Sequence, residues 1–192
     1  ADVALAGVEP DPANAELAAA RSGKPVYVGT VERLPPEVVR EKPDLVCLFD
    51  VLEHIQDDEG ALDVLRNWLA DGGQLALSVP AYRFMWGQQD VVNMHCRRYT
   101  RGELRRKLER HGFAVVRATY FNFVLFPMIA AFRLLAKLPP WRNRPAHSDF
   151  DYSAGPLDRL LYGLFRVEWP FLKYVDAPFG GSCFVLARKL RP

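Results

Sequence analysis

Short, continuous apolar runs recur along this chain and alternate with segments of helical composition. They are spaced roughly 20 to 30 residues apart, and most end at a turn-forming or polar residue. Continuous runs of this kind are typical of strands buried on both faces, and intervening helices favour parallel strand neighbours. The sequence therefore predicts an α/β fold with a Rossmann-like, mostly parallel sheet and helices on both faces. The predicted strands are 3–8, 25–28, 45–49, 74–79, 113–120 and 182–187.

The region before the last predicted strand breaks this alternation. Two amphipathic helices are predicted at 123–137 and 156–174, joined by a loop at 139–153. No repeat or low-complexity linker separates them from the rest of the chain. We therefore expect one domain spanning 1–192, with 123–177 as a helical insertion within it.

The composition narrows the class of protein. Of the 192 residues, 49% are apolar and 25% are charged, which suits one buried core, and a net charge of +2 gives no reason to expect nucleic acid. Three scattered cysteines and four histidines without ligand spacing predict a reducing, cytoplasmic compartment and no metal site. The longest apolar stretch, 120–135, falls short of the roughly 20 residues that a spanning helix needs.

Two predicted strand ends carry residues suited to a nucleoside, which open parallel sheets bind beyond their carboxyl ends. Glu9 could accept both hydrogen bonds of a ribose diol, or it could face the dipole of the following helix. Gly29 would let a flat ring approach the backbone of Thr30 and Val31, or it marks an ordinary turn.

The third run leads into the segment Asp50-Val51-Leu52-Glu53-His54-Ile55, where two acids and a histidine gather at the expected cleft. Glu53 or His54 could act as a general acid or base. The alternative is that both residues begin the next helix and hold loops together. That alternative is favoured for Glu53, and both interpretations stay open for His54.

The polar segment after the fourth run is predicted to lie over the cleft, where loops commonly carry function. His95 could take a proton from an acceptor hydroxyl, and Arg97 and Arg98 could hold a phosphate or carboxylate. Alternatively, His95 and Tyr99 pack the loop down, and the arginines are solvated or pair with Asp90. The candidate catalytic residues are His95 and His54, and the candidate substrate residues are Trp86, Arg97, Arg98 and Tyr99.

Together these segments resemble class I S-adenosylmethionine-dependent methyltransferases in order and spacing, over about residues 2–120. The motifs that carry the resemblance are Leu5-Ala6-Gly7-Val8-Glu9-Pro10, Gly29-Thr30-Val31-Glu32-Arg33-Leu34-Pro35, Phe49-Asp50-Val51-Leu52-Glu53-His54-Ile55, Leu69-Ala70-Asp71-Gly72-Gly73-Gln74-Leu75 and Ser78-Val79-Pro80. The resemblance implies S-adenosylmethionine as cofactor, an antiparallel last strand and methyl transfer to a small-molecule acceptor. It also implies that the cofactor-binding residues are Glu9, Pro10, Gly29, Thr30, Val31, Asp50, Val51 and Leu52.

Two features depart from the family pattern. Thr30 stands where the family usually has an acidic residue that accepts from the adenine amino group, and it can replace that acid only weakly. The sequence also contains no GxGxG loop. We expect a first strand and glycine-rich loop upstream of Ala1, because a sheet without its central strand would expose two apolar edges. A naturally shortened chain is the alternative.

The segments 95–100, 112–113 and 120–127 resemble a bacterial subgroup of these enzymes with a helical insertion before the closing strand. Members of that subgroup often sit beside genes for glycan or lipid-linked sugar assembly, which implies a lipid- or glycan-related acceptor, with oxygen as the expected acceptor atom. The helices at 123–137 and 156–174 could contact a membrane surface peripherally. A helical lid or a homodimer contact is the favoured alternative.

Two other functions fit part of the pattern. A nicotinamide-dependent oxidoreductase would also use Glu9, but the sequence has no Tyr-x-x-x-Lys pair, and a final strand antiparallel to the fifth would argue against it. A non-catalytic binding or assembly protein is the second alternative, because the glycine-rich loop is missing.

Overall fold

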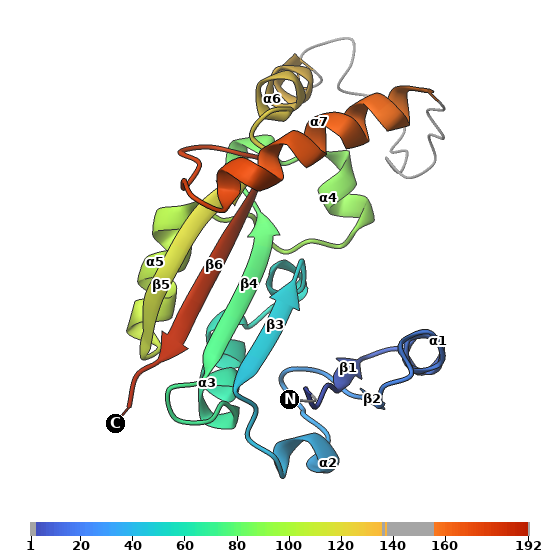
Figure 1. Cartoon of the computed structure of the whole chain (residues 1–192), viewed down its shortest axis with the longest axis vertical. Coiled ribbons are helices and arrows are strands. Elements are labelled where there is room, and N and C mark those ends of the chain that lie inside the picture. The colour runs from blue at the N-terminus through green and yellow to red at the C-terminus, as the bar shows by residue number, and fades with distance from the viewer. Residues whose placement is uncertain (1–2, 136, 138–155, 192) are drawn as a thin grey trace.

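The computed structural model describes residues 3–135, 137 and 156–191 (Figure 1). The loop predicted at 139–153 lies outside the described residues. Two parallel strands near the N-terminus, β1 (Gly7–Glu9) and β2 (Val26–Val28), form a small sheet of their own. The helix α1 (Pro12–Ser22) connects them, as the apolar runs and intervening helical segment predicted.

Local chemistry sets both ends of α1. The Asp11 side chain accepts a hydrogen bond from the Asn14 N–H and caps the helix, and Pro12 occupies its first turn. Gly23 ends the helix with φ of 63°, a left-handed conformation that glycine adopts without steric cost. This short unit turns the chain so that β1 and β2 end at the same edge.

The main sheet has the strand order β3–β4–β6–β5. In it β3 (Leu45–Phe49) runs parallel to β4 (Gln74–Pro80), and β6 (Ser182–Lys189) runs antiparallel to both β4 and β5 (Phe113–Phe121). The last strand therefore lies antiparallel beside the fifth, as the fold prediction requires. This arrangement argues against the oxidoreductase interpretation.

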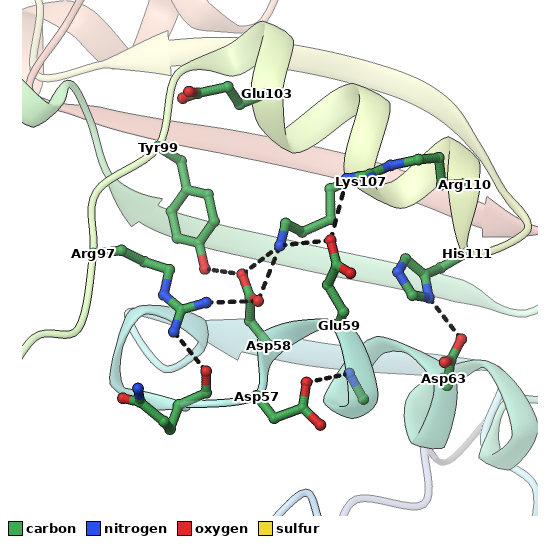
Figure 2. Close-up of polar contacts among 12 residues, drawn as sticks. Asp57, Asp58, Glu59, Asp63, Arg97, Tyr99, Glu103, Lys107, Arg110 and His111 are labelled. Carbon is green, nitrogen blue, oxygen red and sulfur yellow. Dashed lines mark hydrogen bonds and ion pairs between the residues drawn. The ribbon is translucent and has the colours of Figure 1, made fainter.

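One apolar core joins this sheet to two helices, α3 (Asp58–Trp68) and α5 (Arg101–Arg110), which pack side by side on one face (Figures 1 and 2). The fully buried residues at the centre of the core include Leu62, Leu65, Leu75, Leu77, Leu104, Leu108 and Val185. On the opposite face of β3, Leu45 and Phe49 are 52% and 56% exposed. The sheet is thus covered unevenly at this strand.

Capping residues fix the starts of both core helices. Asp57 caps α3 by accepting from the Gly60 N–H, and Thr100 and Glu103 form a reciprocal capping box at the start of α5. Glu53 and His54 lie in a separate 3₁₀ turn, η1 (Leu52–His54), before α3 begins. Because α3 begins only at Asp58, Glu53 and His54 are not part of that helix.

The remaining elements are short helices and the insertion. They are α2 (Pro36–Val39), the 3₁₀ turn η2 (Arg83–Met85), α4 (Gln88–Val92), α6 (Phe126–Leu135) and α7 (Pro156–Leu172). Figure 1 shows α6 and α7 beyond the carboxyl end of β4. No residue of α6 is buried, and among the described residues no helix has the length and hydropathy to cross a bilayer.

Candidate functional site

A cavity of about 450 Å³ opens at the carboxyl ends of β3 and β4. Its lining comes from the end of β3, the turn η1, the end of β4, the segment after α4 and the start of β6. Open α/β sheets bind ligands at this edge. The lining residues are Asp50, Glu53, His54, Pro80, Asn93, His95 and Ser182.

The backbone around this edge is held in left-handed conformations. Asp50, Tyr82 and Asn122 follow β3, β4 and β5, and their φ angles are 52°, 57° and 58°. The Asp50 N–H donates to both the backbone oxygen and the hydroxyl oxygen of Ser78, at 3.0 and 3.1 Å. Strained residues of this kind persist where surrounding structure fixes them, and they gather at functional sites.

The segment after α4 is bound directly to η1. The Cys96 N–H donates to the Glu53 carbonyl at 2.7 Å, and the Cys96 thiol lies 3.5 Å from the His54 carbonyl. Met94, with φ of 55°, reverses the chain just before His95. As a result, the rings of His54 and His95 meet edge to face with 4.8 Å between their centroids.

A buried carboxylate orients His95. Asp90 is fully buried, and its Oδ1 lies 2.9 Å from His95 Nδ1 and 2.6 Å from Arg98 Nε. Burial alone would raise the pKa of Asp90, but the hydrogen bonds from Arg98, His95 and the Gly87 N–H outweigh it and lower that pKa. Asp90 is therefore an anion, so His95 donates from Nδ1, and in the neutral imidazole Nε2 is the acceptor.

Glu53 is the unusual carboxyl of the cavity. It is 0% exposed, and neither of its carboxylate oxygens has a hydrogen-bond partner among the described residues. Burial raises the pKa of Glu53 to about 7. Burial lowers the pKa of His54.

Arg97 and Tyr99 belong to a network of ion pairs and hydrogen bonds centred on Asp58 (Figure 2). Asp58 Oδ1 lies 2.6 Å from Arg97 Nη1, and its Oδ2 accepts from the Tyr99 hydroxyl at 2.7 Å. Lys107 of α5 contacts the same carboxylate at 2.9 Å. These contacts clamp α3 to α5, and they favour a structural role over substrate binding for Arg97 and Tyr99.

The same face carries a larger, open groove of about 1080 Å³. It is lined by charged side chains of the α5 region, and Arg97, Arg98 and Tyr99 are among its walls. Trp86 is half-buried after η2 and lines neither cavity. The structure therefore places Arg97, Tyr99 and Trp86 apart from the predicted catalytic pair, whereas Arg98 is connected to His95 through Asp90.

The nucleoside candidates sit at the ends of β1 and β2. Glu9 Oε1 accepts from the Asp11 N–H at 3.2 Å, and Thr30 Oγ1 accepts from the Arg33 N–H at 3.2 Å. Neither residue lines the two cavities described above. Val31 packs against the main core, as does Val51 after β3, so the loop after β2 reaches the main sheet.

Most of the other predicted cofactor residues also lie outside the smaller cavity. Gly29 donates its N–H to the Glu9 carbonyl at 3.0 Å, and Pro10 is exposed. Leu52, the first residue of η1, is completely buried in the core. Of the eight predicted cofactor residues, only Asp50 lines the smaller cavity. Their roles stay predictions.

Sequence reasoning named Asp90 only as a possible partner of the arginines, which its contact with Arg98 confirms, and it missed the contact with His95. It favoured a loop-holding role for Glu53. Asp90 stands five residues before His95, and that spacing alone does not predict a contact between the two side chains. The contact forms because the chain reverses at Met94. The signal for Glu53 was its place beside His54 in Asp50-Val51-Leu52-Glu53-His54, which the short turn η1 converts into shared access to one cavity.

The methyltransferase domain family matches residues 2–118, more than half of the chain. No curated protein sequence matches the chain. Among solved structures, the chain resembles one from the Haloferax volcanii complex of the Trm112 methyltransferase activator with its partner, at 13% identity and a TM-score of 0.61, covering 97% of this chain and 72% of that one. It also resembles the [4+2]-cyclase SpnF at 17% identity and a TM-score of 0.58, covering 97% and 66%.

A third structure is an S-adenosylmethionine-dependent methyltransferase from Thermotoga maritima, at 19% identity and a TM-score of 0.55, covering 96% of this chain and 72% of that one. At these identities the likeness concerns the fold alone. The family match covers the ends of β1 to β4 and every residue that lines the smaller cavity except Ser182. The chain thus belongs to the methyltransferase domain family, whose enzymes take the methyl group from S-adenosylmethionine.

Proposed function

We propose that this protein transfers a methyl group from S-adenosylmethionine to a hydroxyl oxygen of a small-molecule acceptor in the cavity beside β3 and β4. The observation that carries the proposal is the Asp90–His95 pair, which directs a basic imidazole nitrogen away from Asp90 in a residue that lines the cavity. An acceptor hydroxyl needs such a base, whereas a neutral amine attacks without one.

The predicted cofactor residues suit S-adenosylmethionine by residue type and by their position at the carboxyl ends of β1, β2 and β3. Glu9 would hold the ribose hydroxyls with the carboxylate oxygen that Asp11 does not engage, and Gly29, Thr30 and Val31 would flank the adenine. Asp50 would meet the amino end of the methionine portion, beside the cavity. The bound cofactor would supply an electrophilic methyl group on its sulfonium.

The protein's own contribution is alignment and one proton transfer. His95 Nε2 would accept the proton of the acceptor hydroxyl, and the resulting imidazolium would be stabilised by Asp90. Arg98, 7% exposed, fixes Asp90 and so limits rotation of the histidine. Holding the oxygen and the methyl group in line would then supply most of the acceleration.

The insertion supports an apolar acceptor, and it offers peripheral contact with a lipid surface. Tyr82 stacks on Tyr120 with 5.1 Å between centroids, and Phe126 of α6 contacts both Tyr82 and Phe179. Beyond this cluster, the outer faces of α6 and α7 present exposed apolar side chains, which include Met128, Phe132, Phe165, Trp169 and Phe171. Exposed faces of this kind suit an interfacial position, and a homodimer contact is the alternative.

The proposal can be tested in two steps with the full-length protein. Calorimetry with S-adenosylhomocysteine measures cofactor binding, and labelled S-adenosylmethionine measures methyl transfer to a panel of hydroxylated and amino lipids and phenols. We expect binding, transfer to hydroxyl acceptors, and a fall of about 10²-fold in the rate for His95→Gln. His111→Gln is the matched control, because His111 also pairs with an aspartate but lies outside the cavity.

A binding protein without catalysis is the alternative that this experiment separates. No heat change with millimolar S-adenosylhomocysteine would favour it over an enzyme. Transfer to amines alone, at the same rate in His95→Gln, would instead contradict the choice of oxygen while leaving methyl transfer in place.

A further inference from the structure

We propose that Glu53, His54 and His95 form a binding site for a first-row divalent transition-metal ion such as Zn²⁺. One ligand atom from each residue lies within 4.8 Å of the others. Two come from one turn, η1, and the third comes from a segment more than forty residues later, so the fold assembles the cluster. The histidine spacing in the sequence gave no sign of it.

Glu53 supplies the strongest physical argument. Its side chain is completely buried and lines the cavity, yet both carboxylate oxygens lack a hydrogen-bond partner among the described residues. Buried carboxyl groups in proteins are paired, hydrogen-bonded or bound to metal, because leaving one unpartnered costs several kcal/mol. A cation between Glu53 and the two histidines would satisfy that requirement.

His95 is prepared as a ligand. Its Nδ1 is engaged by Asp90 at 2.9 Å, which fixes the tautomer and leaves Nε2 with a lone pair. Asp90 is itself held at 2.6 Å by Arg98 and at 2.8 Å by the Gly87 N–H. A carboxylate behind a histidine is the usual support of a protein metal ligand, because it orients the ring and raises its basicity.

The ligand set selects the class of ion. Two imidazoles and one carboxylate favour Zn²⁺ and its transition-metal neighbours over Mg²⁺ and Ca²⁺, which prefer oxygen ligands. Ligand atoms around one tetrahedral Zn²⁺ stand about 3.4 Å apart. The exposed His54 side chain can rotate to close the remaining separation. A fourth position would face the cavity, beside Asp50 and Ser182.

The chemical consequence depends on the proposed function, whereas ion binding does not. With the ion present, His95 Nε2 would be a ligand and could not take the proton. The acceptor oxygen would then bind the ion, which would lower the pKa of its hydroxyl, and the proton would pass to solvent. Without the ion, His95 remains the base.

The test is metal binding to the full-length protein after removal of bound metal with a chelator. Calorimetry with ZnCl₂, and separately with MgCl₂, gives stoichiometry and affinity, and the visible absorption of the Co²⁺-loaded protein reports the ligand set. We expect one Zn²⁺ per chain, bound at least tenfold more tightly than Mg²⁺. We expect His54→Asn and Glu53→Gln each to weaken Zn²⁺ binding by tenfold or more.

Two controls separate this site from other ligands. His111→Asn removes a histidine paired with Asp63 outside the cavity, and Cys96→Ser removes an exposed thiol next to the site. Both variants should bind Zn²⁺ as the unmodified protein does. Because Glu53→Gln alters a buried residue and could misfold, His54→Asn, an exposed position, decides the outcome. Unchanged Zn²⁺ affinity in His54→Asn, loss in Cys96→Ser alone, or tighter binding of Mg²⁺ would overturn the proposal.

Discussion

Asp90 and His95 are joined by a 2.9 Å hydrogen bond across the turn that ends α4, and Arg98 binds the same carboxylate oxygen at 2.6 Å. Asp90 of α4 and Arg98 thus set the position of the imidazole that lines the cavity. Arg133 reaches the same carboxylate from α6, at 3.4 Å. Asp90 therefore joins the site to the insertion.

Asp90→Asn should impair both stability and activity. It leaves the Arg98 charge buried without its anion, and the loss of one partner of a buried pair costs about 3 kcal/mol. The amide also no longer enforces the His95 tautomer, so we expect methyl transfer to fall by about 10²-fold or more. Urea unfolding and initial rates measure the two effects. The control is Asp63→Asn, which removes an exposed carboxylate paired with His111. It should change the free energy of unfolding and the rate only slightly.

Glu9→Gln should weaken cofactor binding and leave the fold intact. Glu9 lies at the end of β1, and the amide can still accept from the Asp11 N–H but cannot supply a charged acceptor to a ribose diol. Loss of a charge-assisted hydrogen bond predicts about tenfold weaker binding of S-adenosylhomocysteine in calorimetry. Glu16→Gln, on the exposed surface of α1, is the control. Equal affinities in all three proteins would remove Glu9 from the site.

The positions of the main strands agree with the sequence-based expectations because they follow from local and periodic patterns. Continuous apolar runs predicted strands, and the Thr100–Glu103 capping box could be located from residue types alone. The resemblance, rather than periodicity, supplied the direction of β6. Local signals of this kind act over a few residues, so a single sequence reveals them.

The site was harder to predict because its contacts join distant segments. Arg97 and Tyr99 looked like substrate residues, yet Asp58, some forty positions earlier, holds both. The cluster of Glu53 with two histidines depends on Met94 and Asp50 adopting left-handed backbone conformations. Such pairings arise from tertiary packing, so they cannot be predicted from local patterns in a single sequence.

Exposed apolar residues of the insertion should drive association with lipid bilayers. Phe132 is 66% exposed and Trp169 is 68% exposed, and moving both rings out of water contributes a few kcal/mol at about 25 cal/mol per Å². We expect the double variant Phe132→Ser, Trp169→Ser to reduce cosedimentation with lipid vesicles by fivefold or more. Val39→Ser, at an exposed position on α2, is the control. The alternative is a homodimer contact. It would be supported if the double variant and Val39→Ser bind vesicles equally and only the double variant changes from a dimer to a monomer.

Asp58 should control the stability of the fold in acid. Burial alone would raise its pKa, but the hydrogen bonds from Lys107 and Tyr99 and the charge of Arg97 hold the pKa below its ordinary value of 3.8. A carboxyl with a depressed folded-state pKa stabilises the protein above its unfolded-state value, and that contribution disappears as the pH falls through the folded-state value. We therefore expect Asp58→Asn to unfold more readily than the unmodified protein at pH 7.

The difference should shrink as the pH is lowered through and below 3.8, because the unmodified carboxylate then becomes protonated too. At pH 7 the variant leaves Lys107 and Arg97 without their buried anion, which costs about 3 kcal/mol. Urea unfolding between pH 7 and pH 3 measures this convergence. Asp71→Asn, which removes an exposed carboxylate beside Lys189, should run parallel to the unmodified protein across that range. A gap between Asp58→Asn and the unmodified protein that stays constant with pH would mean that the Asp58 carboxylate has no ionic role in clamping α3 to α5.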